Sequence, residues 1–150
     1  MKKTAARPKK TQEKADAQAG ESLESIFKKL KEMLARHAPP FQLCDAGVRN
    51  KDSVQLVVPK PVAIPGAYGG KPVNVQLAAA ILQKGYVGFY LMCIYMNEGA
   101  RKQLSPALLK LLKGKTCFHV NRLDEVLEKD IEAALVLGTK SYQERGWVEG

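Results

Sequence analysis

Two apolar stretches on either side of Lys84-Gly85 constrain the fold of this chain more than any other feature. They run from Val73 to Leu82 and from Tyr86 to Tyr95. Two β-prone segments separated by two turn residues, one of them glycine, are typical of a long β-hairpin. The second stretch is apolar on both of its faces, which indicates a central strand of a sheet rather than an edge strand. The chain is therefore predicted to build a sheet around this hairpin.

The two faces of the hairpin differ in polarity. A two-residue loop would place Asn74 and Gln76 on one face, together with Phe89, Leu91, Cys93 and Tyr95. A three-residue loop would reverse this pairing. Polar residues among aromatic ones mark a mixed surface, so Asn74, Gln76 and Tyr95 are candidate binding residues for a partner protein or a second copy of the chain. The alternative is that the leucine-rich segment 97–113 covers this face.

Helical patterns flank the extended segments. Apolar residues from Leu23 to His37 form one stripe at helical spacing, with Ser22 as the N-cap and Pro39-Pro40 as the stop. We expect His37, in the last turn, to contact free carbonyl groups. A second helix is predicted from Asp124 to Gly146. With strands at 54–58 and 115–120, the pattern predicts an α+β domain over residues 21–150, its N- and C-terminal helices packed on an antiparallel sheet.

The charge of +9 is concentrated at one end of the chain. Residues 1–20 hold six of the 24 Lys and Arg and two of the 15 acids, with no Val, Ile, Leu, Phe, Tyr or Trp. Such a segment is predicted to be a disordered basic tail, which either solubilises the protein or binds nucleic acid weakly and nonspecifically. Three cysteines without a C-x-x-C pair, and no apolar run of membrane-spanning length, favour a cytoplasmic protein.

The strand GKTCFHV, residues 114–120, brings one cysteine close to one of the two histidines. Alternation turns Phe118 and Val120 toward the core and places Lys115, Cys117 and His119 on the other face, where they are candidate binding residues. A zinc site needs four ligands and a Cys-His nucleophile needs a third orienting group, and the sequence identifies neither. The phosphate-loop, dinucleotide, zinc-protease and serine-hydrolase motifs are also missing, so we expect neither an enzyme nor a cofactor.

The last helix carries Glu125, Glu128 and Glu132 on one exposed stripe. Carboxylates with this spacing could hold a ferrous ion or a hard cation. A solvated helix face explains the same stripe, because Lys129 follows Glu125 by four residues and is a salt-bridge partner for it.

Several short runs resemble the YdhG-like family, a bacterial domain-of-unknown-function family with a frataxin-like α+β arrangement. They are Gly70-Lys71-Pro72-Val73, the Lys84-Gly85 hairpin, Gly88-Phe89-Tyr90-Leu91-Met92 and Gly114-Lys115-Thr116-Cys117-Phe118, within residues 22–147. The resemblance implies two helices flanking an antiparallel sheet and, as in some members, iron as the cofactor of a chaperone for iron–sulfur assembly. Our leading hypothesis is a noncatalytic cytoplasmic binding or adaptor domain for a protein or small ligand, and the iron chaperone is the alternative.

Overall fold

The computed structural model describes residues 22–96 and 98–149, and the predicted tail over residues 1–20 lies outside them. The elements, in chain order, are α1 (Leu23–Ala35), β1 (Gln42–Cys44), β2 (Ser53–Val57), the 3₁₀ turn η1 (Tyr68–Gly70), β3 (Gln76–Leu82), β4 (Val87–Leu91), α2 (Cys93–Met96), α3 (Glu98–Lys102), α4 (Pro106–Leu109), β5 (Leu112–Lys113), β6 (Cys117–Val120) and α5 (Glu125–Glu144). The fold is α+β with an antiparallel sheet, as the sequence predicts.

Both terminal helices begin at the predicted caps. The Ser22 hydroxyl accepts a hydrogen bond from the Ser25 N–H at 3.1 Å, and the Asp124 carboxylate accepts one from the Leu127 N–H at 2.8 Å. Each cap satisfies a backbone donor that the first turn of a helix leaves free. At the far end of α5, Gly146 has a φ of 78° and ends the helix in the left-handed conformation that glycine adopts without strain.

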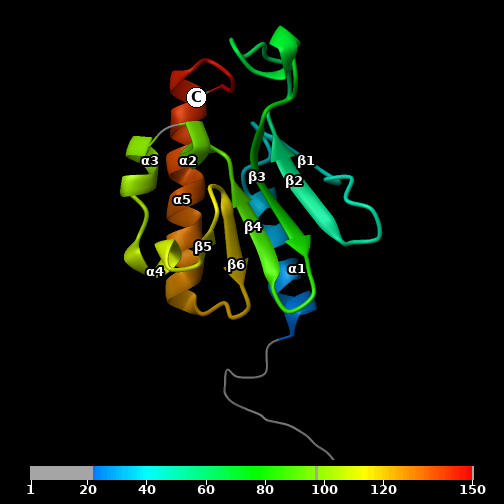
Figure 1. The fold of residues 1–150 in the computed structure, drawn as a ribbon, viewed down its shortest axis with the longest axis vertical. Coiled ribbons are helices and arrows are strands. Elements are labelled where there is room, and N and C mark those ends of the chain that lie inside the picture. Colours follow the sequence, from blue (N-terminus) through cyan, green and yellow to red (C-terminus); the bar gives the residue numbers. More distant parts are fainter. Residues whose placement is uncertain (1–21, 97, 150) are drawn as a thin grey trace, which may run out of the picture.

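The six strands lie in the order β1-β2-β3-β4-β6-β5, and each neighbouring pair is antiparallel. Leu82 pairs with Val87, and the Gln83 N–H donates to the Tyr86 carbonyl at 3.0 Å, so the hairpin loop is the predicted Lys84-Gly85. β4 lies between β3 and β6, which confirms the prediction of a central strand. In Figure 1 the view is onto this sheet, with α1 behind its strands.

The second predicted strand is too long. Pairing in β4 ends at Leu91, and Cys93–Met96 form the helix α2, so the prediction of a strand to Tyr95 is wrong. A short apolar run suits a buried strand and a buried helix equally well, and its periodicity does not separate them. The edge strands β1 and β5 have three and two residues and were not predicted.

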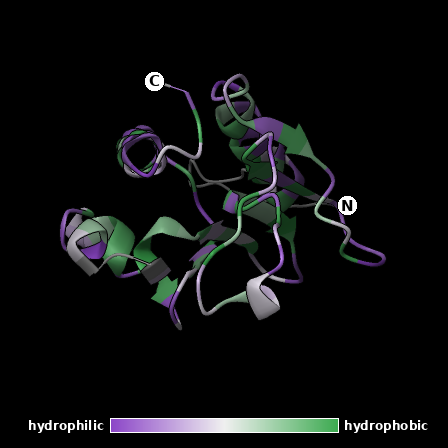
Figure 2. Ribbon diagram, turned by 90° about the horizontal axis from the view of Figure 1, so that it is seen from above, coloured by the Kyte–Doolittle hydropathy of each residue, from purple (hydrophilic) through white to green (hydrophobic). Residues whose placement is uncertain are grey.

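Helices α1 and α5 pack on the same face of the sheet. α1 contacts β2, β3 and β4, α5 contacts β3, and His37 at the end of α1 reaches Glu132 of α5. The core between them contains Phe89 and Phe118, whose ring centres are 5.9 Å apart. In Figure 2, α5 is seen end-on with hydrophilic and hydrophobic residues around its circumference, as expected for a helix with one buried side.

The leucine-rich segment does not cover the other face of the sheet. Its α4 packs against α5, with Leu108 fully buried and Leu104 nearly so. Within residues 22–96 and 98–149, no helix packs on the face opposite α1 and α5. We call this surface the open face.

Candidate functional site

A β-bulge decides which residues reach the open face. Leu56 pairs with Ala78, but the next residue, Val57, pairs with Gln76, so Leu77 has no partner in β2. Leu77 is fully buried, whereas the Gln76 side chain turns outward and donates from Nε2 to Oε1 of Gln55 at 2.8 Å. The extra residue therefore reverses the facing of Gln76 relative to simple alternation.

The predicted grouping of Asn74 and Gln76 with Phe89 and Leu91 is wrong for this reason. Phe89 and Leu91 are fully buried in the core. Asn74 is exposed, and its Nδ2 donates to the Val58 carbonyl at 3.0 Å. This hydrogen bond links the segment that follows β2 to the segment that precedes β3. Asn74 therefore has a structural contact, and Gln76 alone of this pair belongs to the open face.

The strand register brings a row of polar and aromatic residues together on the open face. Across five strands the row is Gln55, Ala79, Tyr90, Cys117 and Lys113, and the next row is Ser53, Ile81, Gly88 and His119. None of these residues carries a carboxylate. Cys117 and His119 alternate with buried Phe118 and Val120, as the sequence predicts.

Three aromatic rings form one cluster on this face. The rings of Tyr86 and His119 are stacked, with centres 3.8 Å apart and planes 11° apart. A Cβ atom at Gly88 would lie 3.0 Å from Cε1 of Tyr90, which shows that the Tyr90 ring lies down over this glycine, beside the stacked pair. Because all three rings are half-buried, the cluster presents aromatic surface to solvent.

The thiol in this cluster is not activated. The Tyr90 hydroxyl donates to the Cys117 sulfur, and burial, with help from this neighbour, raises the pKa of Tyr90 to about 12. Burial also raises the pKa of Cys117, and the hydrogen bond from Tyr90 opposes this only in part. A catalytic thiol needs a lowered pKa, so Cys117 is not prepared to act as a nucleophile.

Lysines stand at the margins of the open face. Lys113 is exposed on β5, in register with Cys117. Lys51 and Lys84 line a shallow hollow with Gln83 at the hairpin end, together with Asp52. At the other end, the Lys115 ammonium lies 5.6 Å from the centre of the Tyr95 ring. The centre of the face carries no charged side chain, and its edges carry these lysines together with Asp52 and with Asp45, whose carboxylate accepts a hydrogen bond from the Ser53 hydroxyl at 3.3 Å.

Beyond this end of the open face is a cleft of about 650 Å³. It is lined by Ile64, Gly66, Ala67, Tyr68, Val75, Gln76, Met92, Tyr95 and Arg145. Of the predicted binding residues, Gln76 and Tyr95 line the cleft, and Lys115 contacts the Tyr95 ring without being part of the lining. Cys117 and His119 lie on the open face. Sequence reasoning missed Tyr86, Tyr90, Tyr68 and Arg145, because their neighbours come from other segments.

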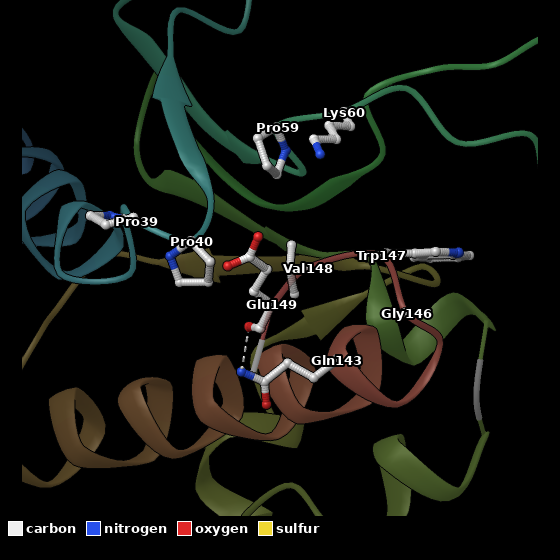
Figure 3. Close-up of a pocket in the computed structure, with 9 residues that line it drawn as sticks. All are labelled: Pro39, Pro40, Pro59, Lys60, Gln143, Gly146, Trp147, Val148 and Glu149. Atoms are coloured by element: carbon white, nitrogen blue, oxygen red, sulfur yellow. Dashed lines mark hydrogen bonds between the residues drawn. The ribbon is translucent and has the colours of Figure 1, made fainter.

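A second hollow, of about 610 Å³, lies between the C-terminal segment and the prolines that follow α1 and β2 (Figure 3). Its walls are Pro39, Pro40, Pro59, Lys60, Gln143, Gly146, Trp147, Val148 and Glu149. The Gln143 amide is turned toward the C-terminal segment and donates to the Glu149 carbonyl at 3.1 Å. The charged residues of this lining are Lys60 and Glu149, and the lining contains no cysteine, serine, threonine or histidine that would act as a nucleophile or base.

The carboxylates of α5 have separate partners. Glu125 is exposed, with its Oε1 4.0 Å from Nζ of Lys129. Glu132 Oε2 lies 3.0 Å from Nε2 of His37, which therefore meets a carboxylate rather than the carbonyl groups expected from the sequence. Among the residues that the structure describes, no group of three or more His, Cys, Asp or Glu is placed to hold a metal, and Glu125, Glu128 and Glu132 are no exception.

Comparison of the chain with protein-family models, with curated proteins and with solved structures finds no match. In the described part of the chain, no helix combines the length and the apolar character needed to cross a membrane.

Proposed function

We propose that this protein is a noncatalytic binding domain whose open face binds single-stranded nucleic acid. The observation that carries the proposal is the cluster of Tyr86, His119 and Tyr90 on the open face. Proteins bind single strands by stacking bases on aromatic side chains of a sheet and by attracting the phosphates with lysines. The cluster supplies the stacking surface.

The charges at the margins fit the same ligand. Lys113 and Lys84 are exposed on two sides of the cluster, where the backbone of a strand that stacks on the rings would run. Stacking does not depend on base identity, because every base has a π face, so we expect little sequence preference. The raised pKa of Cys117 supports a binding role rather than catalysis.

The resemblance to the YdhG-like family is part of the proposal. Its signature runs Gly88–Met92 and Gly114–Phe118 overlap β4 and β6, the two strands that carry the aromatic cluster. We therefore propose that the frataxin-like arrangement of this family serves here to display the open face.

Fluorescence anisotropy with a labelled single-stranded oligonucleotide of about 12 nucleotides tests the proposal, since one small domain covers about 4–16 nucleotides. We expect Tyr86→Ala and His119→Ala each to weaken binding about tenfold, the usual effect of removing one stacking ring. Lys113→Gln should weaken binding to all sequences and reduce the salt dependence. Lys129→Gln is the matched control, because it removes the same charge from an exposed site on α5, behind the sheet.

Two further measurements distinguish strand binding by the open face from binding by the tail and from dimerisation through the open face. If deletion of residues 1–20 abolishes binding while Tyr86→Ala leaves it unchanged, the tail is the binding element and the proposal is wrong. Sedimentation velocity without nucleic acid tests the homodimer that the sequence suggests. A dimer that Tyr86→Glu dissociates into folded monomers would assign the open face to a second copy of the chain instead.

A further inference from the structure

The cleft at the end of the open face has the features of a small-ligand site. Its volume of about 650 Å³ is within the usual range for such sites, about 300–1,000 Å³. One wall comes from the loop 62–75, and the other from α2 and the C-terminal end of α5. These segments are distant in sequence and meet only in the folded chain.

The loop wall is held in place and carries a strained tyrosine. Val62 and Val73 exchange two backbone hydrogen bonds, of 2.7 and 2.9 Å, which close the base of the loop. Tyr68 has a φ of 54°, in the left-handed region that side chains other than those of Asn and Asp rarely occupy. Tyr68 is nevertheless 56% exposed rather than packed in the core. Strain of this kind at an exposed aromatic residue is a feature of ligand sites.

The opposite wall carries a second exposed ring, Tyr95, and one cation, Arg145. Tyr95 is 59% exposed and has the Lys115 ammonium 5.6 Å from its ring centre. Arg145 caps α5, and its guanidinium lies 5.0 Å from the centre of the Trp147 ring. The lining of the cleft includes no carboxylate, so the charge facing a ligand is positive.

We propose that the cleft binds a nucleoside monophosphate, with the base against Tyr68 and Tyr95 and the phosphate near Arg145 and Lys115. Two exposed rings select a planar aromatic group. The Arg145 guanidinium in the lining, together with the Lys115 ammonium at the Tyr95 ring, favours an anion. A free nucleotide and the terminal nucleotide of a strand share this chemistry. The proposal therefore does not require that the open face bind a strand.

Trp147 is the only tryptophan of the chain and contacts Arg145, so its fluorescence reports on the surroundings of Arg145, although Trp147 itself lines the second hollow. Full-length protein is titrated with AMP, with adenosine and with inorganic phosphate, and calorimetry gives the affinity of each. AMP should bind at least about tenfold more tightly than either part, because it uses both kinds of contact. Oligonucleotides with and without a 5′-phosphate then distinguish a strand end from a free nucleotide.

Variants locate the site. Tyr95→Ala and Arg145→Gln should each weaken AMP binding about tenfold, and Tyr95→Phe should keep it, since the ring provides the contact. Tyr86→Ala on the open face is the control and should not change AMP affinity. Melting temperatures verify that each variant folds. The proposal is overturned if AMP causes no heat at millimolar concentration, if phosphate alone binds as well as AMP, or if Tyr86→Ala weakens AMP binding as much as Tyr95→Ala does. AMP binding that Tyr95→Ala weakens but Tyr86→Ala does not, even if the open face fails to bind a strand, supports it.

Discussion

Replacing Tyr142 by phenylalanine removes one hydroxyl from the point where α5 meets the sheet. Tyr142 is fully buried, and its hydroxyl donates to the Gln76 carbonyl, the first of β3, at 2.8 Å. The phenylalanine ring fills the same space but leaves this carbonyl without its donor. Loss of such a bond lowers the free energy of unfolding by about 1–2 kcal/mol. For a chain of this size, that corresponds to a fall in Tm of about 2–8 °C.

The same hydroxyl makes the effect depend on pH. Burial raises the pKa of Tyr142 far above its ordinary value. A group whose pKa is raised by folding contributes stability below its unfolded pKa, and this contribution is lost as the pH rises. At about pH 11 the ionisation of an unfolded tyrosine, with a pKa of about 10, favours unfolding by about 1.4 kcal/mol. The advantage of tyrosine over phenylalanine at position 142 should therefore shrink from about 1.5 kcal/mol at neutral pH to nearly zero at about pH 11.

Urea denaturation of the wild type and of Tyr142→Phe, at neutral pH and at about pH 11, measures both quantities. Tyr95→Phe is the matched control, because it removes the same atom from a ring that is 59% exposed, and it should change the unfolding free energy little at either pH. A gap between wild type and Tyr142→Phe that stays constant or widens at high pH would refute the assignment of a buried, neutral hydroxyl. Equal stability at neutral pH would refute the contribution of the hydrogen bond.

Gly138→Ala should lower the free energy of unfolding by about 1–2 kcal/mol, because the new Cβ would lie 2.7 Å from Cδ1 of fully buried Leu77. This clash outweighs the better helix propensity of alanine. A variant that is more stable in urea denaturation would contradict this. Thiol labelling of the native protein should modify exposed Cys44 first and Cys117 slowly, and rapid labelling of Cys117 at neutral pH would indicate a reactive thiolate. Anaerobic titration with ferrous iron should give no saturable heat at millimolar metal, whereas a stoichiometric site lost in Glu128→Ala would restore the iron-chaperone alternative.

The elements that the sequence predicts well are those fixed by neighbouring residues. The helices follow from apolar stripes of three to four turns and from caps such as Ser22 and Asp124, whose partners lie three residues away. The position of the hairpin follows from Lys84-Gly85, and of the two loop lengths that the sequence leaves open the structure has the two-residue one. Local chemistry decides these features, so a single sequence contains the information.

The features that sequence reasoning missed depend on contacts between distant residues. His37 meets Glu132 across 95 positions, and nothing near His37 indicates this carboxylate. The aromatic cluster likewise needs Tyr86 and His119 on adjacent strands, and the pairing of β4 with β6 across the intervening helices has no local signal. The sequence does not show that His37 and Glu132, or Tyr86 and His119, are neighbours in the fold.

The bulge in β3 links the two proposed sites, and β3 alone does not predict it. The bulge exists because Leu77 has no pairing partner in β2. As a result the Gln76 side chain lies on the open face, where it donates to Gln55. The carbonyl of the same residue receives the Tyr142 hydroxyl, and Gln76 also lines the cleft. One residue thus belongs to both surfaces and is fixed from both sides of the sheet. Substitution of Gln76 therefore tests the coupling of the two surfaces, because its side chain lies on the open face and in the cleft lining while its carbonyl holds α5.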